Sequence, residues 1–179
     1  MTKKIFYFLF VIFNIFALIY LVYPLPSLPD LPNSVKSNLP GDTVQISHVT
    51  AYYTNMSRTE VMNFYKAYYT GLFRINLNHP PEKAKQVIVD TIPSYYLEEI
   101  VLPLKESLYI NGFEWEQDVF TKPENRIKNK LIYEGKEYHA KITLRRFPTD
   151  IPGRIITFFI TEIALITTVL VLKFSIKHD

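Results

Sequence analysis

Glu162 is the only ionisable residue in an apolar stretch formed by residues 155–172. As an α-helix, this stretch would rise roughly 27 Å, close to the ~30 Å thickness of the hydrocarbon core of a bilayer. A carboxyl group near the centre of a membrane costs about 2.5–3.5 kcal/mol on insertion scales, and such groups usually face a partner or a water-filled path. Glu162 therefore indicates a polar contact inside a membrane.

A second apolar stretch, residues 5–23, carries one strongly polar residue, Asn14, at its midpoint. Glu162 lies one or two positions from the midpoint of its own stretch, so in an antiparallel hairpin the two side chains would differ in depth by roughly 3 Å. We expect Asn14 and Glu162 to hydrogen-bond to each other or to a third helix, with Thr161 adding a weaker contact. The alternatives are a carboxyl group that is simply tolerated and one that conducts protons or ions.

Outside these stretches, no catalytic or metal-binding motif is present. The four histidines lack metal-ligand spacing, and the absence of cysteine removes thiolate ligands, thiol nucleophiles and disulfides. His79 and Glu82 could form an acid–base pair at a helix start, but a capping or surface role is the ordinary interpretation. The sequence therefore predicts no cofactor, no metal site and no enzyme activity.

Arg126, Lys128 and Lys130 alternate along the chain, so on a strand they would share one face. They could contact lipid headgroups or an acidic partner, but a solvated sheet edge is the default interpretation. The net charge of the whole chain is only +3. Because nucleic-acid-binding domains usually carry a larger basic excess, we expect no nucleic-acid partner.

The two apolar stretches predict a protein that crosses the membrane twice. Residues 5–23 are longer than the apolar region of a signal peptide and no small-residue cleavage site follows, so a retained signal anchor is favoured over a cleaved signal. Lys3 and Lys4 precede this span and no basic residue follows before Lys36, which places the N-terminus in the cytoplasm. Basic residues before the second span favour the opposite orientation. Long domains translocate largely regardless of charge, so we let the first span decide.

The resulting organisation has four parts: an N-terminal transmembrane signal anchor (1–23), a proline-rich stalk (24–42), an extracytoplasmic domain (43–150), and a C-terminal transmembrane helix with a short tail (151–179). Both termini are expected in the cytoplasm. Prolines at 24, 26, 29 and 32 favour extended polyproline geometry in the stalk.

The first half of the central domain is predicted to be mostly helical after one strand. Residues 43–53 are rich in β-formers and predict that strand. Ser57 and Glu60 form a capping box for a helix that ends at Gly71. A second helix is expected from Pro81 to about residue 91, and a third over residues 94–108, kinked at Pro103.

The second half of the domain changes to period-two alternation, which is typical of strands. Asn111-Gly112 predicts a turn, residues 113–120 a strand, and residues 130–134 and 136–147 a hairpin, with residues 121–129 as a polar loop. In the last strand, Tyr138, Ala140, Ile142 and Leu144 are expected to share the buried face. The order β-α-α-α-β-β-β predicts an α+β fold, with helices packed on a mainly antiparallel sheet.

Two functions remain open from the sequence. The first is a non-catalytic structural or assembly subunit, whose spans contact the lipid bilayer and other membrane protein subunits and whose domain is presented outside the membrane. The second is an extracytoplasmic ligand-binding or sensing module anchored by two helices, in which tyrosines would line an aromatic cleft.

Overall fold

The computed structural model describes residues 2–25, 27–42, 46–70, 73–80, 83, 86 and 96–178. The chain divides into two compact units. One consists of Met1–Leu25 together with Thr149–Asp179, and the other of Pro26–Pro148.

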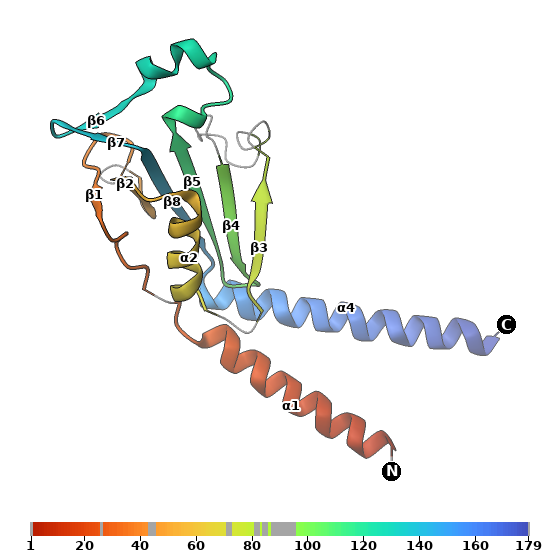
Figure 1. Ribbon diagram of the computed structural model, residues 1–179. Helices are drawn as coiled ribbons and strands as arrows, with labels where there is room; N and C mark the ends of the chain where they lie inside the picture. The colour runs from red at the N-terminus through yellow and green to blue at the C-terminus, as the bar shows by residue number, and fades with distance from the viewer. Residues whose placement is uncertain are drawn as a thin grey trace. The chain divides into compact units, whose positions relative to one another are not determined.

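The unit Pro26–Pro148 is built on a six-stranded sheet in which every neighbouring pair is antiparallel. Its strands are β1 (Ser34–Lys36), β2 (Val49–Thr54), β3 (Ile75–His79), β4 (Tyr96–Leu102), β5 (Glu106–Glu114) and β8 (Ala140–Pro148), in the spatial order β1-β2-β8-β5-β4-β3. The expected α+β class with a mainly antiparallel sheet is confirmed. Figure 1 shows β5 and β8 in the middle of this sheet.

One face of the sheet is deeply buried. Along β5 and β8, buried residues alternate with half-buried ones, as expected for strands covered more completely on one side. Leu108, Ile110, Ile142 and Leu144 point to the covered side, and each is at most 1% exposed. The helix α2 (Arg58–Tyr68) lies against this face and buries Val61, Met62 and Tyr65, as can be followed in Figure 1.

The start of α2 is fixed by local sequence, and the predicted capping box is present. The Ser57 hydroxyl accepts a hydrogen bond from the Glu60 amide, and the Glu60 carboxylate accepts one from the Ser57 amide at 2.8 Å. The helix therefore begins where the sequence predicts. Its predicted stop at Gly71 lies outside the described residues.

We expect Ser57→Ala to destabilise the protein by about 1 kcal/mol, because the first turn of α2 loses its side-chain acceptor. Thermal unfolding of the full chain in a mild detergent should show a midpoint lower by a few degrees. Ser57→Thr keeps the hydroxyl and is the matched control. Equal losses in both variants would contradict a capping role.

The predicted third helix over residues 94–108 is wrong. Residues 96–102 form β4, Pro103, Leu104 and Lys105 form a tight turn, and β5 follows. The error has a physical cause: β4 is buried on both faces and contains the buried pair Glu98-Glu99, so its apolar residues lie on either side of two polar ones and imitate the spacing of a helix. Leu104 has a φ of 61°, and the Lys105 amide donates to the Leu102 carbonyl at 2.9 Å, so Pro103 belongs to a turn between strands.

Two other predictions in this region need correction. Asn111 and Gly112 lie inside β5, and the turn predicted there does not exist. The strand predicted over residues 113–120 ends at Glu114, and the 3₁₀ helix η1 (Trp115–Gln117) follows. The predicted order β-α-α-α-β-β-β is therefore wrong as well, since β3, β4 and most of β5 were not expected. The second predicted helix lies almost entirely outside the described residues.

The hairpin near Gly135 is confirmed as a separate two-stranded sheet of β6 (Leu131–Tyr133) and β7 (Lys136–Tyr138). Glu134 and Gly135 both have positive φ, at 49° and 75°, as tight hairpin turns require. The prediction that Tyr138 shares the buried face of β8 is wrong. Tyr138 ends β7 instead and packs with Tyr133 against Tyr53, on the side of the sheet opposite to Ile142.

The segment predicted as a stalk contributes to the sheet unit. Its residues Ser34–Lys36 form β1, and Val35 packs beside Tyr53. The prolines of this segment give no sign of the pairing. The strand has only three residues, and its register is set by its partner β2.

The other unit contains two long helices, α1 (Thr2–Val22) and α4 (Ile151–His178). Lys4–Val22 and Ile151–Ile176 are each long and apolar enough to cross a membrane, and only 6% of either window is buried. An apolar helix in the core of a soluble domain would be largely buried. The exposure of both helices is thus compatible with a membrane protein, and it leaves their orientation open.

Candidate functional site

The structure brings Asn14 and Glu162 together. The Asn14 amide nitrogen Nδ2 donates a hydrogen bond to Glu162 Oε1 at 3.0 Å, across the pair of helices α1 and α4. The same nitrogen donates to the Phe10 carbonyl, one turn earlier in α1, at 3.1 Å. Both N–H groups of the Asn14 amide are therefore used within the chain, and one of them links the two helices.

Two further contacts join the helices. The rings of Phe13 and Phe158 lie 6.3 Å apart between centroids, and Phe158 is only 8% exposed. Arg154, at 5% exposure, donates from Nη1 to the Leu21 carbonyl at 3.1 Å and from Nη2 to the Thr149 carbonyl at 2.6 Å. Leu21 lies in the last turn of α1, where carbonyl groups lack helical partners, so the guanidinium caps that end.

Thr161 makes its hydrogen bond within its own helix. Its hydroxyl donates to the Thr157 carbonyl within α4 at 2.8 Å, and the side chain is exposed. Thr167 and Thr168 make the equivalent bond one turn back in the same helix. Of the three residues expected to make polar contacts in this unit, the structure pairs Asn14 with Glu162 and leaves Thr161 bonded to its own helix.

The basic triplet does not lie on a strand. Arg126 and Lys128 belong to the 3₁₀ helix η2 (Pro123–Asn129), and Lys130 follows it. Arg126 donates to the Glu116 carbonyl at 2.8 Å, whereas Lys130 forms a 2.8 Å ion pair with Glu137. Lys128 is exposed. Arg126 and Lys130 therefore hold this part of the fold together, and Lys128 alone keeps the exposure of a surface contact.

Three polar residues on neighbouring strands form a cluster that the sequence patterns did not predict. His79 Nε2 of β3 lies 2.8 Å from Glu99 Oε2 of β4, with the two side chains 20% and 9% exposed. Burial and a hydrogen bond from the Tyr109 hydroxyl to Glu99 raise the pKa of Tyr109 to about 12. The alternative pairing of His79 with Glu82 involves a residue outside the described part of the chain. The actual partner Glu99 was hidden because β4 was predicted to be a helix.

A second polar cluster covers the start of α2. Arg58 forms an ion pair with Glu98, and its guanidinium lies 5.0 Å from the centre of the Tyr96 ring. Glu114, at 5% exposure, lies 3.6 Å from His139. Burial raises the pKa of Glu114 despite the opposing effects of His139 and Arg58. These groups pair with one another, so the cluster forms a structural network.

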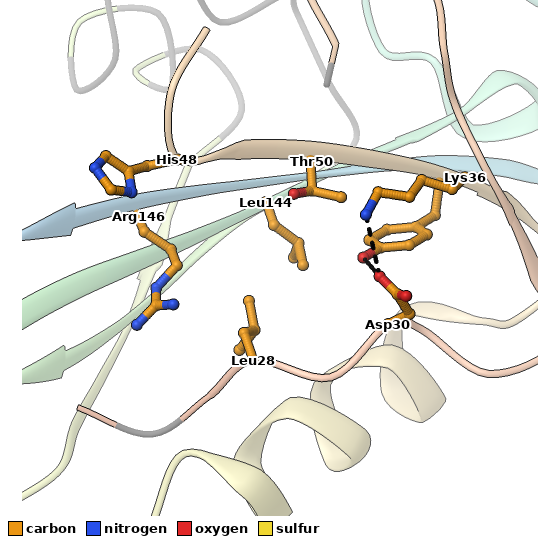
Figure 2. Close-up of a pocket in the computed structure, with 8 residues that line it drawn as sticks. Leu28, Asp30, Lys36, His48, Thr50, Leu144 and Arg146 are labelled. Atoms are coloured by element: carbon orange, nitrogen blue, oxygen red, sulfur yellow. Dashed lines mark hydrogen bonds and ion pairs between the residues drawn. The ribbon is translucent and has the colours of Figure 1, made fainter. Parts of the chain in front are cut away.

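A pocket of about 220 Å³ opens between β2, β8 and the segment that precedes β1. Its middle is apolar and is lined by Leu28 and Leu144. In Figure 2, His48 and Arg146 lie at one end of the pocket, whereas Asp30 and Lys36 lie at the other. Thr50 lies between the two ends on β2.

The Asp30 end of the pocket is organised by hydrogen bonds. The Tyr52 hydroxyl donates to Asp30 Oδ1 at 2.6 Å, and Lys36 Nζ lies 3.4 Å from the same oxygen. Lys36 and Tyr52 are cross-strand partners in β1 and β2, which places both side chains on one face. The hydrogen bond from Tyr52 lowers the pKa of Asp30, so this carboxylate is ionised at neutral pH.

The opposite end is fixed by the neighbouring strands. Glu106, whose side chain is fully buried, accepts hydrogen bonds from Nε and Nη2 of Arg146, both at 3.0 Å. The Arg146 backbone amide donates to the His48 carbonyl at 2.9 Å, and His48 has a φ of 64°. The strand end and the ion pair therefore hold Arg146 and His48 at this end of the pocket.

Replacing Tyr52 by phenylalanine should destabilise the protein at neutral pH and change little in acid. The bond to Tyr52 lowers the folded-state pKa of Asp30, so its contribution is fully present above the unfolded value of about 3.8 and is lost as the pH falls from that value through the lower folded-state pKa. We expect a loss of about 1 kcal/mol at pH 7, kept small because the Asp30 side chain is 73% exposed. Thermal unfolding at pH 7 and pH 3 measures the difference.

Tyr133→Phe is the matched control for this prediction. The Tyr133 hydroxyl donates to the uncharged Asn38 side chain at 2.6 Å. Its removal should cost a similar amount at both pH values. A Tyr52→Phe effect that is equally independent of pH would contradict the assigned role of Asp30.

The separated charges of the pocket are its main chemical feature. Within the described part of the chain, no group of three or more His, Asp or Glu side chains could hold a metal ion. The pocket instead offers separated charges around an apolar middle, an arrangement that orients a small polar ligand.

Comparison with known proteins gives no match: no protein-family model matches the chain, and neither a curated protein nor a solved structure is detectably similar to it.

Proposed function

We propose that the protein is a non-catalytic structural or assembly subunit of a membrane protein complex, anchored by α1 and α4. The observation that carries this proposal is the Asn14–Glu162 hydrogen bond between two helices that are both long and apolar enough to span a bilayer. A carboxyl group in such a helix needs a polar partner, and Asn14 supplies one within the same chain. The two helices then form a hairpin that can pack as one element.

In this proposal, contacts with other subunits use the apolar faces of the hairpin. Ile160, Leu165 and Val169 of α4 are each 62% exposed. In a bilayer, such side chains meet either lipid or another helix with similar energy, so close packing decides the partner. The sheet unit would then be presented outside the membrane, with both termini in the cytoplasm, as Lys3 and Lys4 before the first span favour.

Topology can be tested cleanly because the chain contains no cysteine. We would introduce Lys128→Cys in the sheet unit and Lys177→Cys in the tail, one at a time, and add a membrane-impermeant maleimide to intact cells. The proposal requires labelling at position 128 and protection at position 177 until the membrane is opened. Protection at 128 with labelling at 177 would reverse the orientation.

The assembly role needs a separate experiment. A photo-crosslinking amino acid placed at Leu165 or Val169 should give a discrete protein adduct in the native membrane, whereas one at Lys128 serves as the control outside the span. In parallel, Asn14→Cys combined with Glu162→Cys should form an intramolecular link. A hairpin link together with lipid adducts alone, and a monomer in mild detergent, would refute the assembly role while leaving the anchor intact.

A second function is favoured by one specific observation, the pocket with Asp30 and Arg146 at its ends. In that case the sheet unit is a ligand-binding or sensing module, and the helices only anchor it. Of the tyrosines expected to line an aromatic cleft, Tyr52 lines this pocket, whereas Tyr69 and Tyr96 are at most 1% exposed and belong to the core.

A further inference from the structure

The charges that line the pocket point to a particular class of ligand. Asp30 is anionic, Lys36 and Arg146 are cationic, and the fully buried Glu106 balances Arg146. The site as a whole is therefore close to neutral, although its charges are separated in space. A ligand with opposite charges at its two ends would match this separation, because its cationic group could meet Asp30 while its anionic group meets Arg146.

The accessible groups differ between the two ends. At one end the Asp30 carboxylate is 73% exposed, and both of its donors, Tyr52 and Lys36, bind the same oxygen, Oδ1. The contact with Lys36 is long at 3.4 Å, and the Lys36 side chain is 49% exposed, so an incoming ammonium group can displace it at little cost.

At the other end, Arg146 is held by Glu106 and cannot easily turn away. Its side chain is 24% exposed, which leaves part of it accessible from the pocket. In Figure 2 the Arg146 guanidinium extends toward Leu28, and the His48 imidazole lies at the same end of the pocket, on the other side of the Arg146 backbone. A guanidinium and an imidazole are the side chains best suited to bind a carboxylate or phosphate group.

We propose that this pocket binds a small zwitterion, with its ammonium group at Asp30 and its carboxylate or phosphate group at Arg146 and His48. Leu28 and Leu144 contact the carbon chain between the two groups, and Thr50 offers a hydroxyl midway. The volume of about 220 Å³ fits a ligand of the size of an amino acid or phosphoethanolamine. This inference develops the ligand-binding alternative and does not depend on the assembly role.

The test uses the full chain purified in a non-ionic detergent, with binding followed by calorimetry. The probes are phosphoethanolamine as the zwitterion, ethanolamine as the cation alone, and inorganic phosphate as the anion alone. We expect saturable binding of phosphoethanolamine that is at least tenfold tighter than that of either half. Equal binding of phosphate or of ethanolamine would overturn the proposal, as would no saturable binding of any probe.

Variants test whether the ammonium group of the ligand binds at Asp30. Asp30→Asn keeps the acceptor for Tyr52 but removes the charge. It should weaken the binding of phosphoethanolamine at least tenfold and leave the binding of phosphate unchanged. Glu124→Gln, an exposed carboxylate on η2 away from the pocket, is the matched control and should change nothing. Circular dichroism confirms folding of both variants. Unchanged phosphoethanolamine binding in folded Asp30→Asn would exclude the site.

The same chemistry occurs in a free metabolite and in a lipid headgroup, so a second arm separates these sources. If the ligand is a lipid headgroup, the phosphatidylethanolamine of a nanodisc already occupies the pocket, and added phosphoethanolamine should no longer bind. In nanodiscs of phosphatidylglycerol, binding should persist. Persistence in both identifies a free zwitterion as the ligand.

Discussion

Gly112→Ala is expected to destabilise the sheet unit by about 3 kcal/mol, because a methyl group at this position overlaps Cζ and Cε1 of the Tyr96 ring. Gly112 and Tyr96 are cross-strand partners in β5 and β4. Tyr96 is only 1% exposed, so its ring has nowhere to move without disturbing its neighbours. Thermal unfolding of the full chain in detergent should show a midpoint lower by on the order of 10 °C.

A control at a second glycine separates packing from backbone effects. Gly135, in the turn between β6 and β7, has a φ of 75°, and a methyl group added there would meet no atom within 4 Å, so Gly135→Ala tests strain alone. Its cost should be about 1 kcal/mol. A double variant that adds Tyr96→Val to Gly112→Ala should lose less than the sum of the single changes. Strict additivity would show that the ring does not fill the space above Gly112.

The second large effect is expected at Glu106. Glu106→Ala should cost about 3 kcal/mol, because the Arg146 guanidinium loses its bidentate partner in a position that is mostly shielded from water. Guanidinium chloride is unsuitable as a denaturant here, since it screens charges, so urea or heat should be used. The loss should remain in high salt, because buried pairs are screened far less than exposed ones.

The matched comparison removes both charges. Glu106→Leu combined with Arg146→Leu leaves no unpaired ion, and it should recover most of the stability lost in Glu106→Ala. If the double variant is as unstable as the single one, the ion pair is not the cause of the loss. The double variant should also fail to bind the zwitterion, since it lacks Arg146.

Features set by short-range rules were predictable from the sequence. Ser57 and Glu60 marked the start of α2, and Glu134-Gly135 marked the β6–β7 turn, because capping and tight turns depend on residues three or fewer positions apart. The contact between Asn14 and Glu162 joins residues 148 positions apart, but it was expected because counting residues places both near the midpoints of two apolar stretches of similar length.

Features set by tertiary context were not predictable. The strand β4 resembled a helix because both of its faces are buried, and Gly112 resembled a turn because nothing in the sequence shows that Tyr96 lies above it. The pocket combines Asp30 and Lys36 from the predicted stalk with Arg146 from the last strand. Their meeting depends on the pairing of β1 with β2 and of β2 with β8, which local pattern cannot supply.

The bond from Arg154 to the Leu21 carbonyl joins residues 133 positions apart in the chain. During synthesis, the first helix is made long before this arginine, so the Leu21 carbonyl must bond to water or to another group until Arg154 has been added. This contact between the two helices can therefore form only after Arg154 has been made, and a chain halted before it would leave the Leu21 carbonyl without this donor.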